Sequence, residues 1–154
     1  MDRDRQGLFE PVLQQGTAPT QSYDINKLIY VAFFGGPLAV AALGTRNALW
    51  LRVERKWIYL LAGVALLMLI GKLVWVAMNP AVEQTRTVRY LFRGLAILLF
   101  FGYRWVMGPA YRQHEVLRGE TLPLLKDGLI AVLVAGLVEF LLLTATVIAV
   151  QANA

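Results

Sequence analysis

The sequence of 154 residues contains no cysteine and a single histidine, His114. Without cysteine, the chain cannot form a disulfide bond, a thiolate zinc site or an iron–sulfur cluster. With one histidine, a site built from two or more histidines cannot form within one chain. The sequence also has no phosphate-cradling glycine loop, serine nucleophile elbow or aspartate cluster. We therefore expect no catalytic residues, no metal site and no cofactor.

Charged residues are scarce as well, at 16% of the chain, while 58% of the residues are hydrophobic. Soluble proteins carry roughly 25% charged residues. The mean hydropathy is +0.56, and a domain of this size has too little interior to bury so much apolar surface. The net charge of +5 arises from basic residues that flank apolar runs. This pattern favours a lipid bilayer, and not nucleic acid, as the partner.

Four apolar stretches are long enough to cross a membrane. Crossing about 30 Å of hydrocarbon takes roughly 20 helical residues at about 1.5 Å each. Residues 1–26 are polar and predict a flexible N-terminal tail, followed by a membrane domain over residues 27–154. Pro109 and Pro80 predict helix ends. The sequence predicts an all-α fold, an integral membrane four-helix bundle with short loops, whose helices cover about 28–44, 57–78, 90–107 and 128–150.

Lysine and arginine in the short loops predict the orientation. Loops one, two and three are the connections that follow the first, second and third apolar stretches. Loops one and three carry eight lysine and arginine residues, against six in the tail and loop two. We therefore expect loops one and three in the cytoplasm and both termini outside the cell. The eight are Arg46, Arg52, Arg55, Lys56, Arg104, Arg112, Arg118 and Lys126.

Three charged residues lie within the apolar stretches: Glu139, Lys72 and Arg104. A charge inside the bilayer costs about 2.5 to 3.5 kcal/mol. Glu139 shares a helix face with small residues such as Gly128 and Ala135, so its carboxyl group is predicted to point into the bundle. It either fixes packing through a hydrogen bond or ion pair, handles an ion or proton, or contacts a partner's helix. Lys72 and Arg104 either extend to the headgroups or neutralise Glu139.

The first stretch contains Gly35, Gly36 and Pro37, which predict a helix kink near the membrane centre. Broken membrane helices can present backbone carbonyls to an ion or a substrate. The alternative is that the glycines only allow close packing against another helix.

Loop three is the most polar connection, with Arg112, His114, Glu115 and Arg118. These residues predict an interfacial loop that contacts lipid headgroups or a protein partner. A catalytic role for His114 is the alternative.

The run Gly35-Gly36-Pro37-Leu38-Ala39 is followed by Arg46, Asn47 and Leu49. Later, Gln113-His114 and Gly119 precede the last apolar stretch. This arrangement resembles an uncharacterised family of small bacterial four-span membrane proteins. The resemblance implies a bacterial inner membrane and four helices. The family has no assigned activity, so the resemblance implies no function, and Glu139 is not part of the pattern.

These observations favour a non-enzymatic accessory or structural subunit that associates with other membrane proteins or with itself as a homo-oligomer. One alternative is a small ion- or proton-coupled transporter or channel subunit that uses Glu139. Another is a membrane-embedded enzyme acting on lipid through His114 and Glu115.

Overall fold

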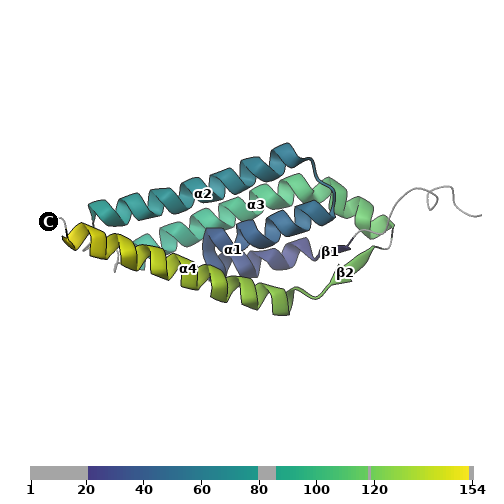
Figure 1. Cartoon of the computed structure of the whole chain (residues 1–154). Helices are drawn as coiled ribbons and strands as arrows, with labels where there is room; N and C mark the ends of the chain where they lie inside the picture. Colours follow the sequence, from purple (N-terminus) through teal and green to yellow (C-terminus); the bar gives the residue numbers. More distant parts are fainter. Residues whose placement is uncertain (1–20, 80–85, 118, 153–154) are drawn as a thin grey trace, which may run out of the picture.

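The computed structural model describes residues 21–79, 86–117 and 119–152 (Figure 1). These ranges contain four long helices, so the all-helical prediction is confirmed. The prediction of a flexible tail over residues 1–20 lies outside the described residues. Residues 21–26 contain β1 and the start of the 3-10 helix η3. The elements are β1 (Gln21–Tyr23), a short 3-10 helix η3 (Ile25–Lys27), α1 (Leu28–Trp50), α2 (Arg55–Met78), α3 (Arg86–Val116), β2 (Glu120–Leu122) and α4 (Leu124–Ala152).

By residue count and composition, all four helices are long and apolar enough to span a membrane, with Ile25–Trp50 counted as one segment. Helices α2 and α4 agree closely with the stretches 57–78 and 128–150. Helix α3 differs, because it continues through Pro109 to Val116. A proline removes one backbone hydrogen bond, but a helix held by packing on both sides can continue through it. Here Met107 before Pro109 and His114 after it are both buried.

Helix α1 reverses direction at Gly36. The backbone angles there are φ 70° and ψ −168°, a conformation that is essentially restricted to glycine. The reversal divides α1 into a first limb, residues 28–35, and a second limb, residues 37–50. At about 1.5 Å per residue the limbs are about 12 Å and 21 Å long, so neither crosses about 30 Å of hydrocarbon. The predicted kink is therefore the tip of a hairpin, the α1 hairpin, and each of its two limbs is shorter than a membrane-spanning helix.

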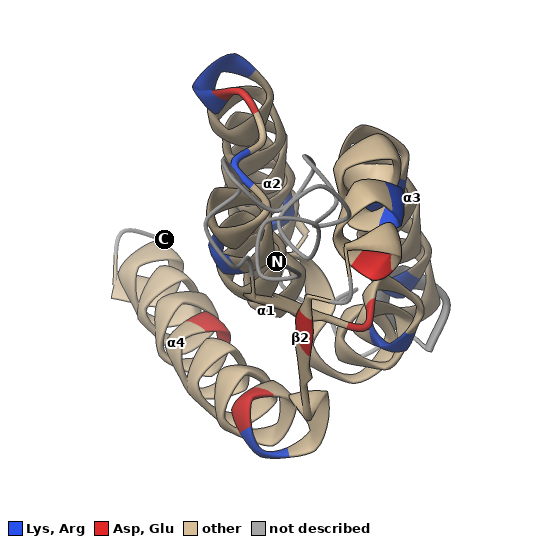
Figure 2. Cartoon of the chain, turned by 90° about the vertical axis from the view of Figure 1, so that its right-hand side faces the viewer, with Lys and Arg blue, Asp and Glu red and all other residues tan. Residues whose placement is uncertain are grey.

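The α1 hairpin lies at the centre of the bundle and packs against α2, α3 and α4 (Figure 2). The second limb approaches α3 most closely at Gly44. A Cβ atom at this position would lie 2.8 Å from the ring of Tyr103, so a larger side chain would force the two helices apart. The core contains buried side chains of both limbs and of the helices around them, including Val31, Ala32, Val40, Leu43, Leu61, Phe100 and Tyr103.

The two strands fix which end of the bundle holds the start of α1. Strand β1 pairs in parallel with β2, with Gln21 opposite Glu120 and Tyr23 opposite Leu122. Both strands and the connection between α1 and α2 therefore lie at one end, called here the strand end (Figure 1). Helix α4 ends at the opposite, far end, where α2 also ends. Within the described residues, β1 lies at the strand end and α4 ends at the far end, because α1 returns to the end from which it starts (Figure 1).

Candidate functional site

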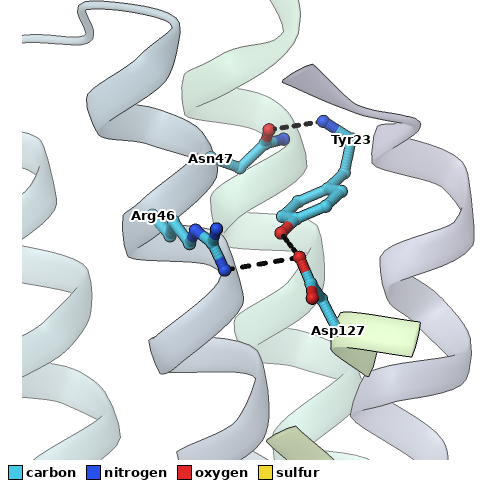
Figure 3. A network of polar contacts seen from close by, with 4 residues as sticks. All are labelled: Tyr23, Arg46, Asn47 and Asp127. Carbon is cyan, nitrogen blue, oxygen red and sulfur yellow. Dashed lines mark hydrogen bonds and ion pairs between the residues drawn. The ribbon is translucent and has the colours of Figure 1, made fainter. Parts of the chain in front are cut away.

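A cluster of polar side chains, the base cluster, closes the hairpin at the strand end (Figure 3). The backbone N–H of Tyr23 donates to Asn47 Oδ1 at 2.8 Å, and the Ser22 hydroxyl donates to the same oxygen at 3.1 Å. The Tyr23 hydroxyl donates to the carboxylate of Asp127. Arg46 forms an ion pair with this carboxylate at 3.4 Å. The base cluster thereby joins β1, the second limb and the start of α4.

The charges of the base cluster balance, with one guanidinium and one carboxylate. The Arg46 guanidinium also lies 4.6 Å from the centre of the Trp50 ring. Burial, together with the hydrogen bond to Asp127, raises the pKa of Tyr23 from 10.0 to about 12. The hydroxyl therefore remains a hydrogen-bond donor at any physiological pH. These features indicate a structural fastening and not a binding site.

A second cluster, the tip cluster, lies at Gly36. Lys72 of α2 and Glu139 of α4 form an ion pair there, with side chains only 20% and 16% exposed. A Cβ atom at Gly36 would lie 3.5 Å from Glu139 Oε2. The structure therefore brings together the predicted kink and two of the three predicted intramembrane charges. Of the two candidate partners for Glu139, it selects Lys72.

The tip cluster also contains Arg93 of α3. Its guanidinium lies 5.5 Å from the centre of the Phe33 ring, and the Lys72 ammonium lies 5.6 Å from the centre of the Phe92 ring. These residues border a cavity of about 180 Å³, called here the tip pocket. The other lining residues are Phe34, Gly35, Gly36, Pro37, Gly136 and Glu139.

The tip pocket is closer to the far end than to the strand end. Lys72 is six residues before the end of α2, and Arg93 is seven residues after the start of α3. At about 1.5 Å per residue, both lie about 10 Å from the helix ends. From the sequence, Arg93 is one of the six basic residues counted with the tail and loop two, and it is not predicted as a site residue. A signal was present, because Arg93 is three residues inside the predicted stretch 90–107.

Arg104 does not approach Glu139. It lines a groove of about 570 Å³ near the strand end, together with Arg112 and Glu115 of α3 and Asn26 of η3. Both arginines are exposed. The three predicted intramembrane charges are thus separated, with Lys72 and Glu139 at the tip cluster and Arg104 in the groove near the strand end.

The predicted interfacial loop is largely helical. Arg112, His114 and Glu115 belong to α3, and Arg118 lies outside the described residues. His114 is only 2% exposed, and its ring stacks on Tyr111 with 6.0 Å between ring centres. Glu115 is exposed. A lipid-acting enzyme would require His114 and Glu115 at one surface. The structure does not place them so, because His114 is buried and Glu115 is exposed.

Within the described ranges, no three histidine, aspartate or glutamate residues are grouped so that they could hold a metal ion. The fold and the tip pocket define an all-helical protein with four membrane-span-like helices and a polar cluster among them. Comparisons with protein-family models, curated proteins and solved structures find no match to this chain. The resemblance to small bacterial membrane proteins therefore stays a prediction.

Proposed function

We propose that this protein is an integral membrane protein in which α2, α3 and α4 cross the bilayer. The α1 hairpin enters from the strand end and returns to it. Irregular backbone at membrane depth is tolerated where protein buries it or where it lines a water-filled cavity. The surroundings of Gly36 are compatible with this rule, since three helices pack against the hairpin and its tip borders the tip pocket.

In this proposal the protein is a small transport or channel component that handles an ion or a proton at the tip pocket. The observation that carries it is the position of Gly36 beside the Lys72–Glu139 pair and the cavity. Charged groups inside a membrane are costly and typically mark ion pathways. Broken helices that meet near the membrane centre are a recurrent way to build an ion site in transporters.

Access to the tip pocket differs between the two ends. The buried side chains of Val31, Leu43 and Phe100 fill the core on the side of the strand end. The conformation described here therefore favours access from the far end. Movement of the hairpin relative to α3 and α4 is the step that would open the opposite route.

The proposed orientation follows from the reversal of α1. Lys27 lies at the strand end, together with loops one and three. A straight α1 would instead place Lys27 at the end of the bundle that holds loop two. This adds to the basic residues at the strand end and favours its location in the cytoplasm. The cell membrane remains the proposed location.

Ion flux into proteoliposomes tests this function. We expect the purified protein to dissipate a salt or pH gradient faster than protein-free vesicles do. Glu139→Gln should assemble normally but lower the rate of ion flux by about tenfold or more, which equals about 1.4 kcal/mol in the barrier. The reason is that Lys72 pairs with Glu139 when the ion leaves, and the variant removes this partner. Glu115→Gln, a change of an exposed carboxylate at the strand end, should leave the flux unchanged. Equal flux in vesicles with and without the protein would contradict the proposal.

The second candidate is the accessory subunit that associates with itself or with other membrane proteins. The exposure of α4 favours it, since only 6% of its most apolar span is buried. An apolar groove of about 610 Å³ also lies between α4 and the first limb, beside Val31 and Gly128. Because the chain has no cysteine, Leu133→Cys on the exposed face of α4 offers a clean test. Disulfide-linked dimers in membranes would support self-association through α4, and monomers only would count against it.

A further inference from the structure

The tip pocket carries more positive than negative charge. Lys72 and Arg93 contribute two cations, and Glu139 contributes one anion. Lys72 pairs with Glu139. Within the described residues, no carboxylate lies within ion-pair distance of Arg93. Residues 79–89, which lead from α2 into α3, add one glutamate and two arginines to the sequence. This part of the chain therefore keeps an excess of positive charge.

We infer that the tip pocket binds a small inorganic anion, which places the ion of the proposed function in the class of anions such as chloride. This inference rests on the proposed function. A guanidinium that has no carboxylate partner among the described residues and lies between apolar helices is costly. An anion between Arg93 and Lys72 neutralises it. Charge-assisted hydrogen bonds from a guanidinium and an ammonium are about twice as strong as those between neutral groups.

Both cations retain donors for such an anion. The faces of Phe33 and Phe92 attract the positive charges of Arg93 and Lys72. An aromatic face leaves most N–H groups available for other partners. Arg93 has five N–H donors and Lys72 has three, of which the carboxylate of Glu139 takes one. The aromatic rings therefore hold the cations at the pocket while their donors remain available.

The volume of the tip pocket suits a small ligand. At about 30 Å³ for each water molecule, 180 Å³ corresponds to about six waters. This suits a small anion with part of its hydration shell. Typical organic ligands occupy pockets of about 300 to 1,000 Å³. The backbone does not decide the sign of the ion, because the C-terminus of the first limb and the N-terminus of the second limb meet at Gly36 with opposite partial charges.

Glu139 acts as an internal competitor in this arrangement. Its carboxylate forms an ion pair with the ammonium of Lys72, and the anion would bind the same ammonium. Glu139→Gln should therefore tighten anion binding, whereas it should weaken the binding of a cation. The two changes in affinity have opposite directions, so they distinguish an anion site from a cation site. Neither change depends on unfolding of the variant.

Line broadening of the chloride NMR signal measures binding by the full chain in nanodiscs of zwitterionic lipid. We expect the wild-type protein to broaden the signal and Arg93→Gln to weaken the apparent affinity about tenfold or more. Arg93→Lys should retain most of the affinity. Arg104→Gln is the matched control, because it removes the same charge from α3 outside the pocket, and it should bind chloride like the wild type. Glu139→Gln should bind chloride several-fold more tightly.

Three results would overturn the inference: no broadening beyond empty nanodiscs, equal losses in Arg93→Gln and Arg104→Gln, or weaker binding in Glu139→Gln. A sodium or proton flux that depends on Glu139, without chloride binding, would overturn the anion class and leave the proposed function in place. Neither flux nor binding of any of these ions would overturn both.

Discussion

The base cluster and the tip cluster lie at opposite ends of the α1 hairpin and differ in their partners and their charge balance. At the base, the carboxylate of Asp127 joins α4 to α1. At the tip, the carboxylate of Glu139 joins α4 to Lys72 of α2, beside Gly36 of α1. At the base, one cation meets one anion, and hydrogen bonds to Tyr23 and Asn47 surround them. At the tip, two cations meet one anion beside a cavity. A balanced and filled cluster fastens a fold, while an unbalanced cluster with adjoining space has room for a ligand.

The exposure of the two ion pairs supports this distinction. The side chains of Arg46 and Asp127 are 51% and 32% exposed, so water screens the pair and its net contribution is about 0 to 1 kcal/mol. The hydrogen bonds therefore contribute most of the stability at the base. Lys72 and Glu139 are less exposed and interact more strongly with any ion that enters.

Removing the carboxylate of the base cluster should have the largest effect on stability. Asp127→Ala leaves the Tyr23 hydroxyl and the Arg46 guanidinium without their shared acceptor, and should lower the free energy of unfolding by about 2 to 3 kcal/mol. Denaturation in mixed detergent micelles measures the change. Lys126→Ala removes the neighbouring exposed charge and should change stability by less than about 0.5 kcal/mol.

The comparison becomes sharper if Asp127→Ala is also assayed for chloride binding. The affinity should remain unchanged, since Asp127 does not line the tip pocket. A loss of affinity in this variant, at a temperature where it is folded, would show that the two clusters are not separate.

A change at the tip should affect stability slightly less. Gly36→Ala forces a side chain into a backbone conformation with positive φ, which costs about 2 kcal/mol. The control is Gly63→Ala in α2, where a Cβ atom meets nothing within 4 Å. This control should be neutral or up to about 1 kcal/mol more stable, because alanine favours a helix. Equal stability of the two variants, measured by the same denaturation, would contradict the reversal of α1 at Gly36.

Hydrophobic length predicted the outer helices well and α1 poorly. A run of apolar residues shows that a segment avoids water, which was sufficient to predict α2 and α4. It does not show whether the segment crosses the membrane or returns, since both limbs of a hairpin need the same composition. The only local signal was Gly35-Gly36-Pro37, which predicts a bend but not its angle. The extension of α3 was missed because Pro109 is a helix-breaking signal that tertiary packing overcomes.

The candidate site was predictable residue by residue but not as an arrangement. Glu139 and Lys72 are conspicuous as charges in apolar runs. Their pairing depends on the relative depth and rotation of α2 and α4, which the sequence does not specify. Tyr23 and Asp127 were missed because they lie at the margins of the apolar stretches, where polar residues are common. Only the return of the second limb brings Asn47 and Arg46 to them.

The smallest expected effect comes from one hydroxyl group of the base cluster. Tyr23→Phe removes the donor to Asp127 and should lower the free energy of unfolding by about 1 kcal/mol. The pKa of Tyr23 is raised from 10.0 to about 12 in the folded protein, so folding favours the protonated form. The contribution of the hydroxyl is therefore complete below pH 10 and is lost as the pH rises through about 12. The stability difference between wild type and Tyr23→Phe should be constant up to pH 10 and then narrow. The matched control, Tyr59→Phe at an exposed position of α2, should have almost no effect on stability.

Phenolate absorbance provides a second measurement, because the wild-type spectrum minus that of Tyr23→Phe should titrate near pH 12 in the folded state. A difference titration near pH 10 would show that Tyr23 is solvated, and the base of the hairpin would then be open.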